Sequence, residues 1–459
     1  MAKTPSPRPP LGWNSWDCYG TTVTEAEVLA NAEHMAQHLL PFGWDTVVVD
    51  IDWSDPTARS HGYNEGAPLN LDDLGRLMPD PERFPSSADG AGFGPLADKI
   101  HGLGLKFGIH VMRGIPRRAT AERLAVAGAG EAAAGVSAGT GASAGAGASS
   151  APVTADQIAD ETNRCEWNPH MDGLRHDHPG AQAYYDSVVA LYASWGVDFI
   201  KADDMLWPYQ AADIEAFSLA IERSGRPIEL SLSPGRDLSL TRLDHLREHA
   251  TMWRICDDLW DVWEDVEANF ARFARWAPTA SEHGWPDGDM LPLGHIGIRA
   301  ERGEPRDSRL TQAERVTLMT LWVIARSPLM IGGDLPTSSP ETIALFTNAD
   351  VLAVLDSRGS REVFREGDLV LWTADDVARA GWVAAFNLGT EPLSVALDAG
   401  DVGVPADGSE RVRELWTGED VATHGVTVQS DEARGVAPGS VAIPVTIEGH
   451  GARLLRWEA

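Results

Sequence analysis

The chain has 459 residues, of which 43% are hydrophobic and 23% charged, proportions typical of a folded protein with more than one domain. Its 37 Lys and Arg stand against 68 Asp and Glu, so the formal net charge is −31. Nucleic acids and anionic membranes are bound through clustered Lys and Arg, so this charge argues against both as partners. A neutral small-molecule substrate suits the composition better. No Gly-rich phosphate loop follows any apolar run, and we expect no cofactor.

The chain contains only three cysteines, at positions 18, 165 and 256. That number is small for a disulfide-stapled secreted domain, and an odd number cannot be fully paired. The first ten residues lack the apolar stretch of a signal peptide, and no run of about 18 apolar residues is present. The sequence therefore predicts a cytoplasmic protein, and leaves open whether it is a homo-oligomer.

Short runs rich in Val, Ile and Leu alternate with helical patterns over most of the chain. Such runs are typical of strands buried on both faces, and their alternation with helices is typical of a parallel sheet. Eight strands are predicted, at residues 11–16, 46–53, 105–112, 197–204, 228–233, 251–256, 289–294 and 328–333. Eight βα units predict an α/β fold, a (β/α)₈ TIM barrel over residues 1–356.

Two segments differ in composition from the predicted barrel. Residues 125–152 consist almost entirely of Ala, Gly, Ser and Thr, which cannot bury enough surface to order a chain, so we expect a disordered insertion. After Arg358 the pattern changes to short alternating strands separated by Gly and Asp turns. This pattern predicts a C-terminal antiparallel β-sandwich domain over residues 357–459.

Polar residues follow or end several predicted strands. They are Asp50, Asp52, His110, Asp203, Asp204, Ser233, Asp257 and Asp258. The C-terminal ends of the strands build the active sites of such barrels. A single aspartate there could merely cap the next helix, but carboxylates at the ends of three strands favour an enzyme.

The segment IKADDML carries the first candidate catalytic group. Alternation along a strand places Lys201 and Asp203 on one side and Asp204 on the other. A neighbouring lysine keeps a carboxylate ionised and nucleophilic at neutral pH. The structural alternative is a buried ion pair that only stabilises the barrel.

The segment MWRICDDLWDVW carries the second candidate. Arg254 lies within the predicted strand, Asp257 and Asp258 follow it, and tryptophans flank them. Indole walls exclude water and raise the pKa of a carboxyl group, as a general acid requires, although tryptophans also pack in ordinary cores. Two carboxylates from different strands that face one cleft are the catalytic equipment of a glycosidase.

Five segments resemble, in the same order, the motifs of glycoside hydrolase family 27. This family comprises α-galactosidases and α-N-acetylgalactosaminidases, with relatives active on β-L-arabinopyranosides and isomaltose units. The segments are PPLGWNSWDCYG, IKADD, MWRICDD, GWPDGDML and LMTLWVIARSPLMIGGDL. They resemble the family's PPMGWNSW, K-Y-D, W-R-x-x-x-D, W-N-D-P-D-M-L and A-L-W-x-x-x-x-x-P-L motifs. The match runs from about Pro9 to Asp356, and the all-β tail agrees with the family's C-terminal domain.

The resemblance implies retaining hydrolysis, with Asp203 as the nucleophile and Asp258 as the acid/base. Asp257 is the rival for the second role, because spacing alone separates the two. Sugar-binding candidates come from the resemblance and from the strand-end positions: Trp16, Asp50, Asp52, His110, Lys201, Ser233, Arg254 and Asp289. For Asp289 and His110 a purely structural role stays open.

Several departures from the family pattern concern the sugar. Two adjacent aspartates of the family are replaced by Asp50-Ile51-Asp52, which predicts that one sugar contact is lost or rebuilt. The sequence Leu232-Ser233-Pro234 stands where α-galactosidases often have Cys-Glu-Trp. We therefore expect an α-galactosidase-like exo-glycosidase, with an α-N-acetylgalactosaminide, a β-L-arabinopyranoside or an isomaltose-type α-glucoside as alternative substrates.

Three other functions fit the sequence less well than a glycosidase. A catalytically silent sugar-binding barrel would not need both carboxylates. A metal-dependent hydrolase would need clustered histidines, and the first strand has none, so no metal site is expected. A Schiff-base enzyme would need the pKa of Lys201 to be lowered, which nearby carboxylates oppose.

Overall fold

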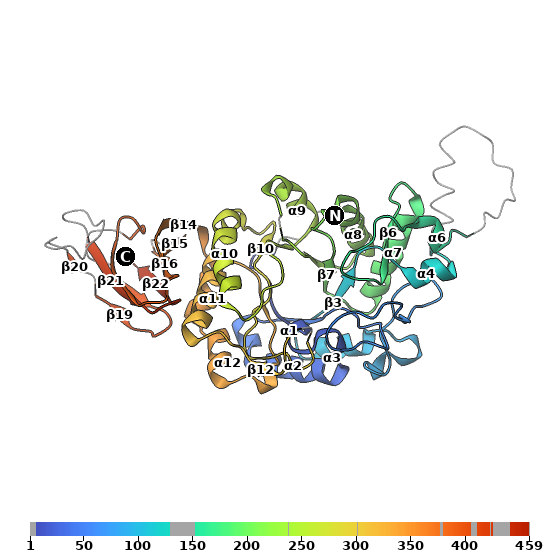
Figure 1. Cartoon of the computed structure of the whole chain (residues 1–459), viewed down its shortest axis with the longest axis horizontal. Helices are drawn as coiled ribbons and strands as arrows, with labels where there is room; N and C mark the ends of the chain where they lie inside the picture. The colour runs from blue at the N-terminus through green and yellow to red at the C-terminus, as the bar shows by residue number, and fades with distance from the viewer. Residues whose placement is uncertain are drawn as a thin grey trace.

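The computed structural model describes residues 6–128, 152–236, 238–300, 302–376, 380–404, 411–422, 424–425 and 441–458. Residues 129–151 of the predicted disordered insertion lie outside the described residues. The chain forms a barrel surrounded by helices and, beside it, a group of C-terminal strands (Figure 1).

The first part is a (β/α)₈ barrel, as predicted. Its sheet follows the order β10-β9-β8-β7-β3-β2-β1-β13, and all neighbouring strands are parallel. The strands are β1 (Leu11–Asn14), β2 (Thr46–Val49), β3 (Lys106–Met112), β7 (Phe199–Asp203), β8 (Glu229–Leu232), β9 (Met252–Arg254), β10 (Trp285–Asp287) and β13 (Leu329–Ile331). An isolated parallel bridge joins Leu291, in the segment after β10, to Ile331 of the other edge strand, β13.

The seventh strand differs from its prediction. It is β10, Trp285–Asp287, whereas residues 289–294 had been predicted. Residues 289–294 form an apolar run, which is typical of a buried strand, but most of them form the loop that follows β10. Only Leu291 of that run forms a bridge to β13.

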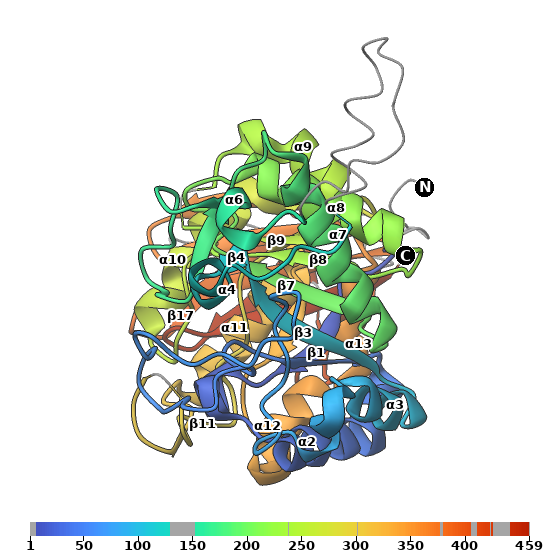
Figure 2. The same cartoon turned by 90° about the vertical axis from the view of Figure 1, so that its right-hand side faces the viewer.

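Helices surround the strands (Figure 2). The longer ones are α2 (Glu25–His38), α3 (Gly94–Gly102), α7 (Pro179–Ser194), α8 (Ala211–Ser224), α10 (Trp263–Trp276) and α11 (Gln312–Ala325). Shorter ones are α1 (Trp16–Tyr19), α9 (Leu243–His249), α12 (Pro340–Phe346) and α13 (Ala349–Leu352). α2 begins with a capping box between Thr24 and Glu27 and buries Val28, Ala32 and Met35, as its period predicts.

Apolar side chains fill the barrel interior. Val48, Phe199, Met252 and Met330 come from four different strands and form one buried cluster. Gly12 of β1 makes room for them, because a Cβ there would collide with the carbonyl oxygen of Thr46. The interior is thus packed, and the polar groups lie at the strand ends.

A small antiparallel sheet lies beyond the C-terminal end of β3. Its order is β4 (Ile115–Pro116), β6 (Met171–Leu174) and β5 (Ala159–Asp160). The short helices α4 (Arg117–Glu122) and α6 (Ala155–Ile158) accompany it. This sheet brings residues 159–174 to the end of the barrel at which the strand-end carboxylates lie.

The C-terminal part is antiparallel, as predicted for a β-sandwich. One sheet has the order β14-β15-β16-β22-β18-β19 and the other β17-β21-β20. The strands are β14 (Arg358–Glu366), β15 (Leu369–Asp375), β16 (Ala380–Asn387), β17 (Leu393–Asp398), β18 (Arg411–Glu414), β19 (Asp420–Val421), β20 (His424–Gly425), β21 (Val441–Ile447) and β22 (Ala452–Glu458). The boundary between residues 356 and 357 stays a prediction.

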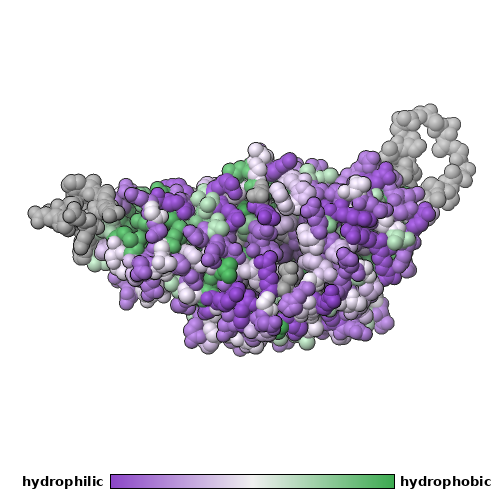
Figure 3. Space-filling view, in the orientation of Figure 1, coloured by the Kyte–Doolittle hydropathy of each residue, from purple (hydrophilic) through white to green (hydrophobic). Residues whose placement is uncertain are grey.

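The C-terminal strands pack against helices of the barrel. Phe270 of α10 meets Phe386 of β16 edge to face, and Trp263 stacks on His450 with ring centroids 4.0 Å apart. The face drawn in Figure 3 is mainly hydrophilic, with hydrophobic patches over the region of the C-terminal strands. None of the described helices is long and apolar enough to cross a membrane.

Candidate active site

Asp50, directly after β2, is held by three donors. Lys201 Nζ lies 2.8 Å from its Oδ2, and Asn14 Nδ2 donates to the same oxygen at 2.7 Å. The backbone N–H of Ile51 donates to Oδ1 at 2.8 Å. Burial disfavours the ionised form, but Lys201 and His110 hold the pKa of Asp50 below its usual value. This carboxylate is therefore an oriented anion beside the strand end.

Asp203 ends β7 and is also held as an anion. His110 Nε2 lies 3.0 Å from its Oδ2, and the N–H of Asp204 donates to Oδ1 at 2.8 Å. Burial opposes ionisation, but the hydrogen bond from His110 and the charge of Lys201 hold the pKa of Asp203 well below its usual range. An ionised carboxylate at a barrel mouth can act as a nucleophile.

Lys201 is a cation at neutral pH. Burial alone would lower its pKa, but Asp50 and Asp203 raise it above the usual value of a lysine. A Schiff-base lysine needs the opposite shift, so this geometry argues against an aldolase-type enzyme.

Asp204, the residue after β7, has a different partner from Asp203. Its backbone is left-handed, with φ at 59°, and its carboxylate lies 2.7 Å from Nε of the buried Arg113. Burial raises the pKa of Asp204 to about 6 although Arg113 lowers it. This residue ties β7 to the end of β3 rather than facing the same space as Asp203.

Arg254, at the end of β9, holds two other carboxylates. Its guanidinium lies 2.8 Å from Asp258 Oδ1 and also bonds Asp289, whose Oδ2 accepts the N–H of Leu259 at 2.7 Å. Asp258 remains 40% exposed, so protons can reach it. Asp257 is 57% exposed, and the cation nearest to it, Arg236, lies 3.9 Å away.

The two groups of charges belong to one site. Lys201 interacts electrostatically with Asp50 and Asp203 and also with Arg254 and Asp289. The charged groups at the ends of β7 and β9 therefore lie within electrostatic reach of one another at one end of the barrel.

Asp17, which the sequence analysis did not single out, lies within this space. It is buried, and within the described chain neither carboxylate oxygen has a hydrogen-bond partner. Burial and the nearby Asp289 and Asp258 raise the pKa of Asp17 well above its usual value. Its position after Trp16 is an ordinary helix-start pattern, which offered no signal of a role in the site.

An apolar cluster lines the same end of the barrel. It contains Trp16, Ile51, Met112, Met171 and Trp260, all buried. Trp16 was predicted as a wall of the sugar site, and Ile51 stands where the family pattern has its second aspartate. The cluster supplies a dry apolar surface beside the carboxylates.

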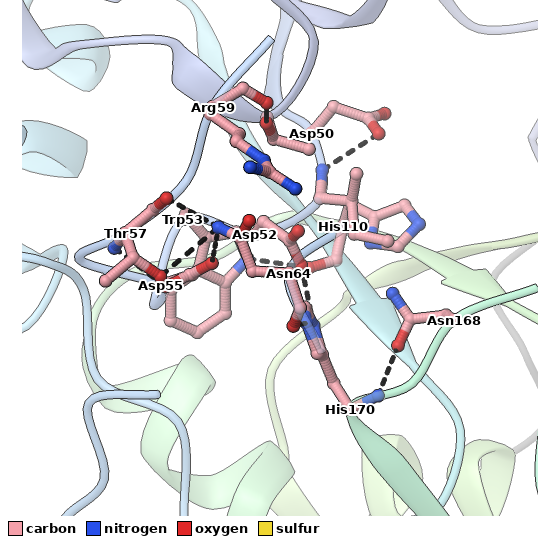
Figure 4. Close-up of polar contacts among 12 residues, drawn as sticks. Asp50, Asp52, Trp53, Asp55, Thr57, Arg59, Asn64, His110, Asn168 and His170 are labelled. Carbon is pink, nitrogen blue, oxygen red and sulfur yellow. Dashed lines mark hydrogen bonds and ion pairs between the residues drawn. The ribbon is translucent and has the colours of Figure 1, made fainter. Parts of the chain in front are cut away.

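Asp52 faces a different set of residues (Figure 4). Its Oδ1 lies 3.1 Å from His170 Nδ1, and His170 Nε2 lies 3.1 Å from the carbonyl oxygen of Asn64. Asp55 adjoins this pair, so that the three side chains could in principle hold a metal ion. Both ring nitrogens of His170 already face acceptors, so the ring offers no free nitrogen to a metal ion.

Ser233 Oγ, after β8, and Asn168 Nδ2, before β6, are among the buried polar groups that lack partners within the described part of the chain. Ser233 had been predicted as a sugar ligand, whereas Asn168 and His170 had not. The segment CEWNPHM that carries Asn168 and His170 has no period, and nothing in its sequence shows that it returns to the barrel mouth.

A cavity of about 460 Å³ adjoins Trp260, two residues after Asp258. Arg302 lies over the Trp260 ring at 5.5 Å, and Arg306, which also lines the cavity, pairs with the buried Asp261. Charged side chains make up much of the lining of this cavity, and Asp258 is not one of its lining residues.

Comparison with known proteins identifies the family. Residues 173–357 match the family model described as alpha galactosidase A, and residues 366–457 match that of the alpha-galactosidase C-terminal β-sandwich domain. The curated α-galactosidase of Coffea arabica is 26% identical over 418 residues, which cover 89% of this chain and 86% of that protein.

Solved structures give a higher similarity. A family 27 β-L-arabinopyranosidase of Geobacillus stearothermophilus, in complex with arabinose, is 42% identical with a TM-score of 0.87, and the match covers 99% of this chain and 98% of that one. A candidate α-N-acetylgalactosaminidase of Bacillus halodurans is 38% identical with a TM-score of 0.80, over 100% and 99% of the two chains. The chain therefore belongs to glycoside hydrolase family 27, the α-galactosidase family of glycosidases.

Proposed function

We propose that Asp203 is the nucleophile and Asp258 the acid/base of a retaining exo-glycosidase. An oxygen of Asp203 attacks the anomeric carbon while Asp258 gives its proton to the departing glycosidic oxygen, which leaves as an alcohol. Asp258, now a carboxylate, takes a proton from water. The resulting hydroxide attacks the anomeric carbon and releases Asp203, so two inversions retain the configuration.

The electrostatics of the site support these roles. Asp203 is ionised and unable to lose its charge at neutral pH, because His110 and Lys201 stabilise the anion. Asp258 is anchored by Arg254 and is 40% exposed, so that water can reach the carboxyl group that we propose as the acid/base. Asp257 is 57% exposed and lies 3.9 Å from Arg236, a looser contact than that of Asp258 with Arg254, which favours Asp258 for the second role.

The sugar would lie among the remaining groups of the barrel mouth. We assign its polar contacts to Asp50, His110, Lys201, Ser233, Arg254 and Asp289, and its apolar wall to Trp16. Asp52 acts indirectly, because its carboxylate binds His170. The leaving group would extend toward the cavity beside Trp260.

For the sugar itself we propose a β-L-arabinopyranosyl unit. This sugar has the ring configuration of an α-D-galactopyranoside but carries hydrogen instead of a hydroxymethyl group at C5. The observation that carries the proposal is Ile51, which replaces a carboxylate by an apolar side chain within the cluster of Met112 and Met171. An apolar wall suits a ring without the hydroxymethyl group, because a buried hydroxyl without a partner is costly. The similarity to the arabinopyranosidase agrees with it.

The test is a panel of 4-nitrophenyl glycosides. We expect the highest kcat/KM with β-L-arabinopyranoside and a lower value with α-D-galactopyranoside. A clear preference for α-D-galactopyranoside or α-N-acetylgalactosaminide would overturn the assignment of the sugar, and inertness toward all of them would favour a binding protein.

We also propose that the enzyme works in a reducing compartment, as the cytoplasm is. All three cysteines, Cys18, Cys165 and Cys256, are buried and unpaired. Burial raises the pKa of Cys165 to about 12, so this thiol stays protonated and unreactive.

A further inference from the structure

The small sheet after β3 delivers one side chain whose hydrogen bonding is incomplete. Asn168 lies between β5 and β6 and is 1% exposed. Its Oδ1 accepts the backbone N–H of His170 at 2.9 Å, but its Nδ2 has no partner among the residues that the structure describes. A buried amide without a partner costs about 1–3 kcal/mol, so its persistence calls for an explanation.

The direction of the amide supplies one. Because Oδ1 is fixed to the backbone of His170, Nδ2 must point the other way, and Figure 4 shows it on the side of the His110 ring. His110 is itself bonded to Asp203. The neighbours Cys165 and Met171 belong to the apolar cluster around Ile51. The free donor thus points toward His110, the residue that bonds the candidate nucleophile.

The position of Asn168 is fixed by its surroundings. His170 is clamped by Asp52 on one ring nitrogen and by the carbonyl of Asn64 on the other, and its own carbonyl accepts the N–H of Arg117 at 2.9 Å. The amide is therefore oriented before any ligand arrives. A ligand that accepts a hydrogen bond from it binds with little loss of side-chain entropy.

We propose that Asn168 Nδ2 donates a hydrogen bond to a ring hydroxyl of the substrate sugar and is a specificity-determining residue. This inference rests on the proposed function. A sugar hydroxyl offers the missing acceptor, and Asn168 supplies a neutral donor. The inserted segment thereby contributes directly to the sugar site.

The test combines the substitution Asn168→Ala with the removal of single hydroxyl groups from the substrate, and compares the two effects on KM as in a double-mutant cycle. KM and kcat are measured for the aryl glycoside that the wild type hydrolyses best and for its 2-, 3- and 4-deoxy analogues. Loss of one neutral hydrogen bond raises KM of the parent glycoside about threefold to tenfold. With one deoxy analogue the substitution has no further effect, because that analogue lacks the acceptor.

Asn168→Asp serves as the second variant, because it keeps the oxygen that accepts from His170, and so the turn, even if Asn168→Ala fails to fold. Because its carboxylate can only accept, its effect on KM with that same analogue should differ from its effect with the other analogues. Asn163→Ala is the control: its amide lies in the same segment but bonds Arg113 and Gln210, and KM should stay unchanged.

An equal rise of KM with the parent and with every deoxy analogue would overturn the inference and reduce Asn168 to a turn residue. So would an unchanged KM in both variants. In either case the wild-type activity, and with it the proposed function, would still stand. A wild type that hydrolyses no glycoside would overturn the proposed function first, and this inference with it.

Discussion

Nε2 of His110 lies 3.0 Å from Oδ2 of Asp203, so the candidate nucleophile takes a hydrogen bond from the neighbouring strand. Together with Lys201 this contact holds the pKa of Asp203 well below its usual range. The pair gives the ionisation of the nucleophile a specific structural cause, which can be removed by mutation.

His110→Gln should raise the pKa of Asp203, because it weakens the stabilisation of the anion. The nucleophile acts as the anion, so activity is lost as the pH falls through its pKa. The acid limb of kcat/KM should therefore move to higher pH, with kcat/KM lowered at acidic pH more than at pH 7. His101→Gln is a matched control, since His101 pairs with Asp198 at the opposite end of the barrel, and its profile should not move.

Asp203→Asn should reduce kcat by at least about 10³-fold, because the amide cannot form the glycosyl ester. Asp98→Asn, an exposed site on α3, should behave as wild type. Thermal denaturation shows whether both variants fold. Residual turnover of Asp203→Asn near the wild-type rate would disprove its role.

Asp258→Asn should lower kcat/KM more for substrates with more basic leaving groups, because these leaving groups depend more on protonation. Disaccharides or methyl glycosides should lose about 10²–10⁴-fold in kcat/KM, whereas dinitrophenyl glycosides need little protonation and should lose far less. Asp257→Asn should leave both classes unchanged. If the two variants exchanged these behaviours, Asp257 would be the acid/base.

Ile51→Asp should shift the preference from β-L-arabinopyranoside toward α-D-galactopyranoside by about tenfold, because a carboxylate can accept from the hydroxymethyl group. The ratio of the two kcat/KM values measures the shift. Ile51→Val keeps the apolar wall and should keep the wild-type ratio. An unchanged ratio in a folded Ile51→Asp variant would separate this position from sugar selection.

His170→Gln should lower stability in a pH-dependent way. Burial lowers the pKa of His170, but Asp52 more than offsets this and raises it above 6.5. The ion pair therefore contributes fully below pH 6.5, and its contribution is lost as the pH rises through the raised pKa in the folded state. The variant should lose about 1.5–3 kcal/mol at pH 6 and clearly less at pH 9 in denaturant titrations. An equal loss at both values would mean that the charge of His170 is not involved.

Much of the fold follows from local pattern. Buried strands such as Thr46–Val49 and Phe199–Asp203 read as apolar runs, and their ends carry the polar groups that the barrel gathers. The strand β10 was not predicted, because Trp285–Asp287 contains a proline and is shorter than the apolar loop that follows it. Local sequence alone does not show that this short segment, rather than the more hydrophobic residues 289–294, forms the strand.

The site shows a similar division. Alternation along one strand predicts that Lys201 and Asp203 lie on the same side of it. No local pattern predicts that the carboxylate of Asp52 contacts His170. That contact joins residues 118 positions apart and depends on where the inserted segment returns. Asn168 lies on the same segment, so its place too was decided by tertiary structure.

The most direct test of the central claim is to trap the glycosyl enzyme. A 2-deoxy-2-fluoro glycoside of the preferred sugar with an activated leaving group slows the second step, and mass spectrometry of peptic peptides locates the ester. The account predicts a single adduct on Asp203, absent from Asp203→Asn, and release of the product with retained configuration. An adduct on another residue, or an inverted product with no adduct, would contradict it.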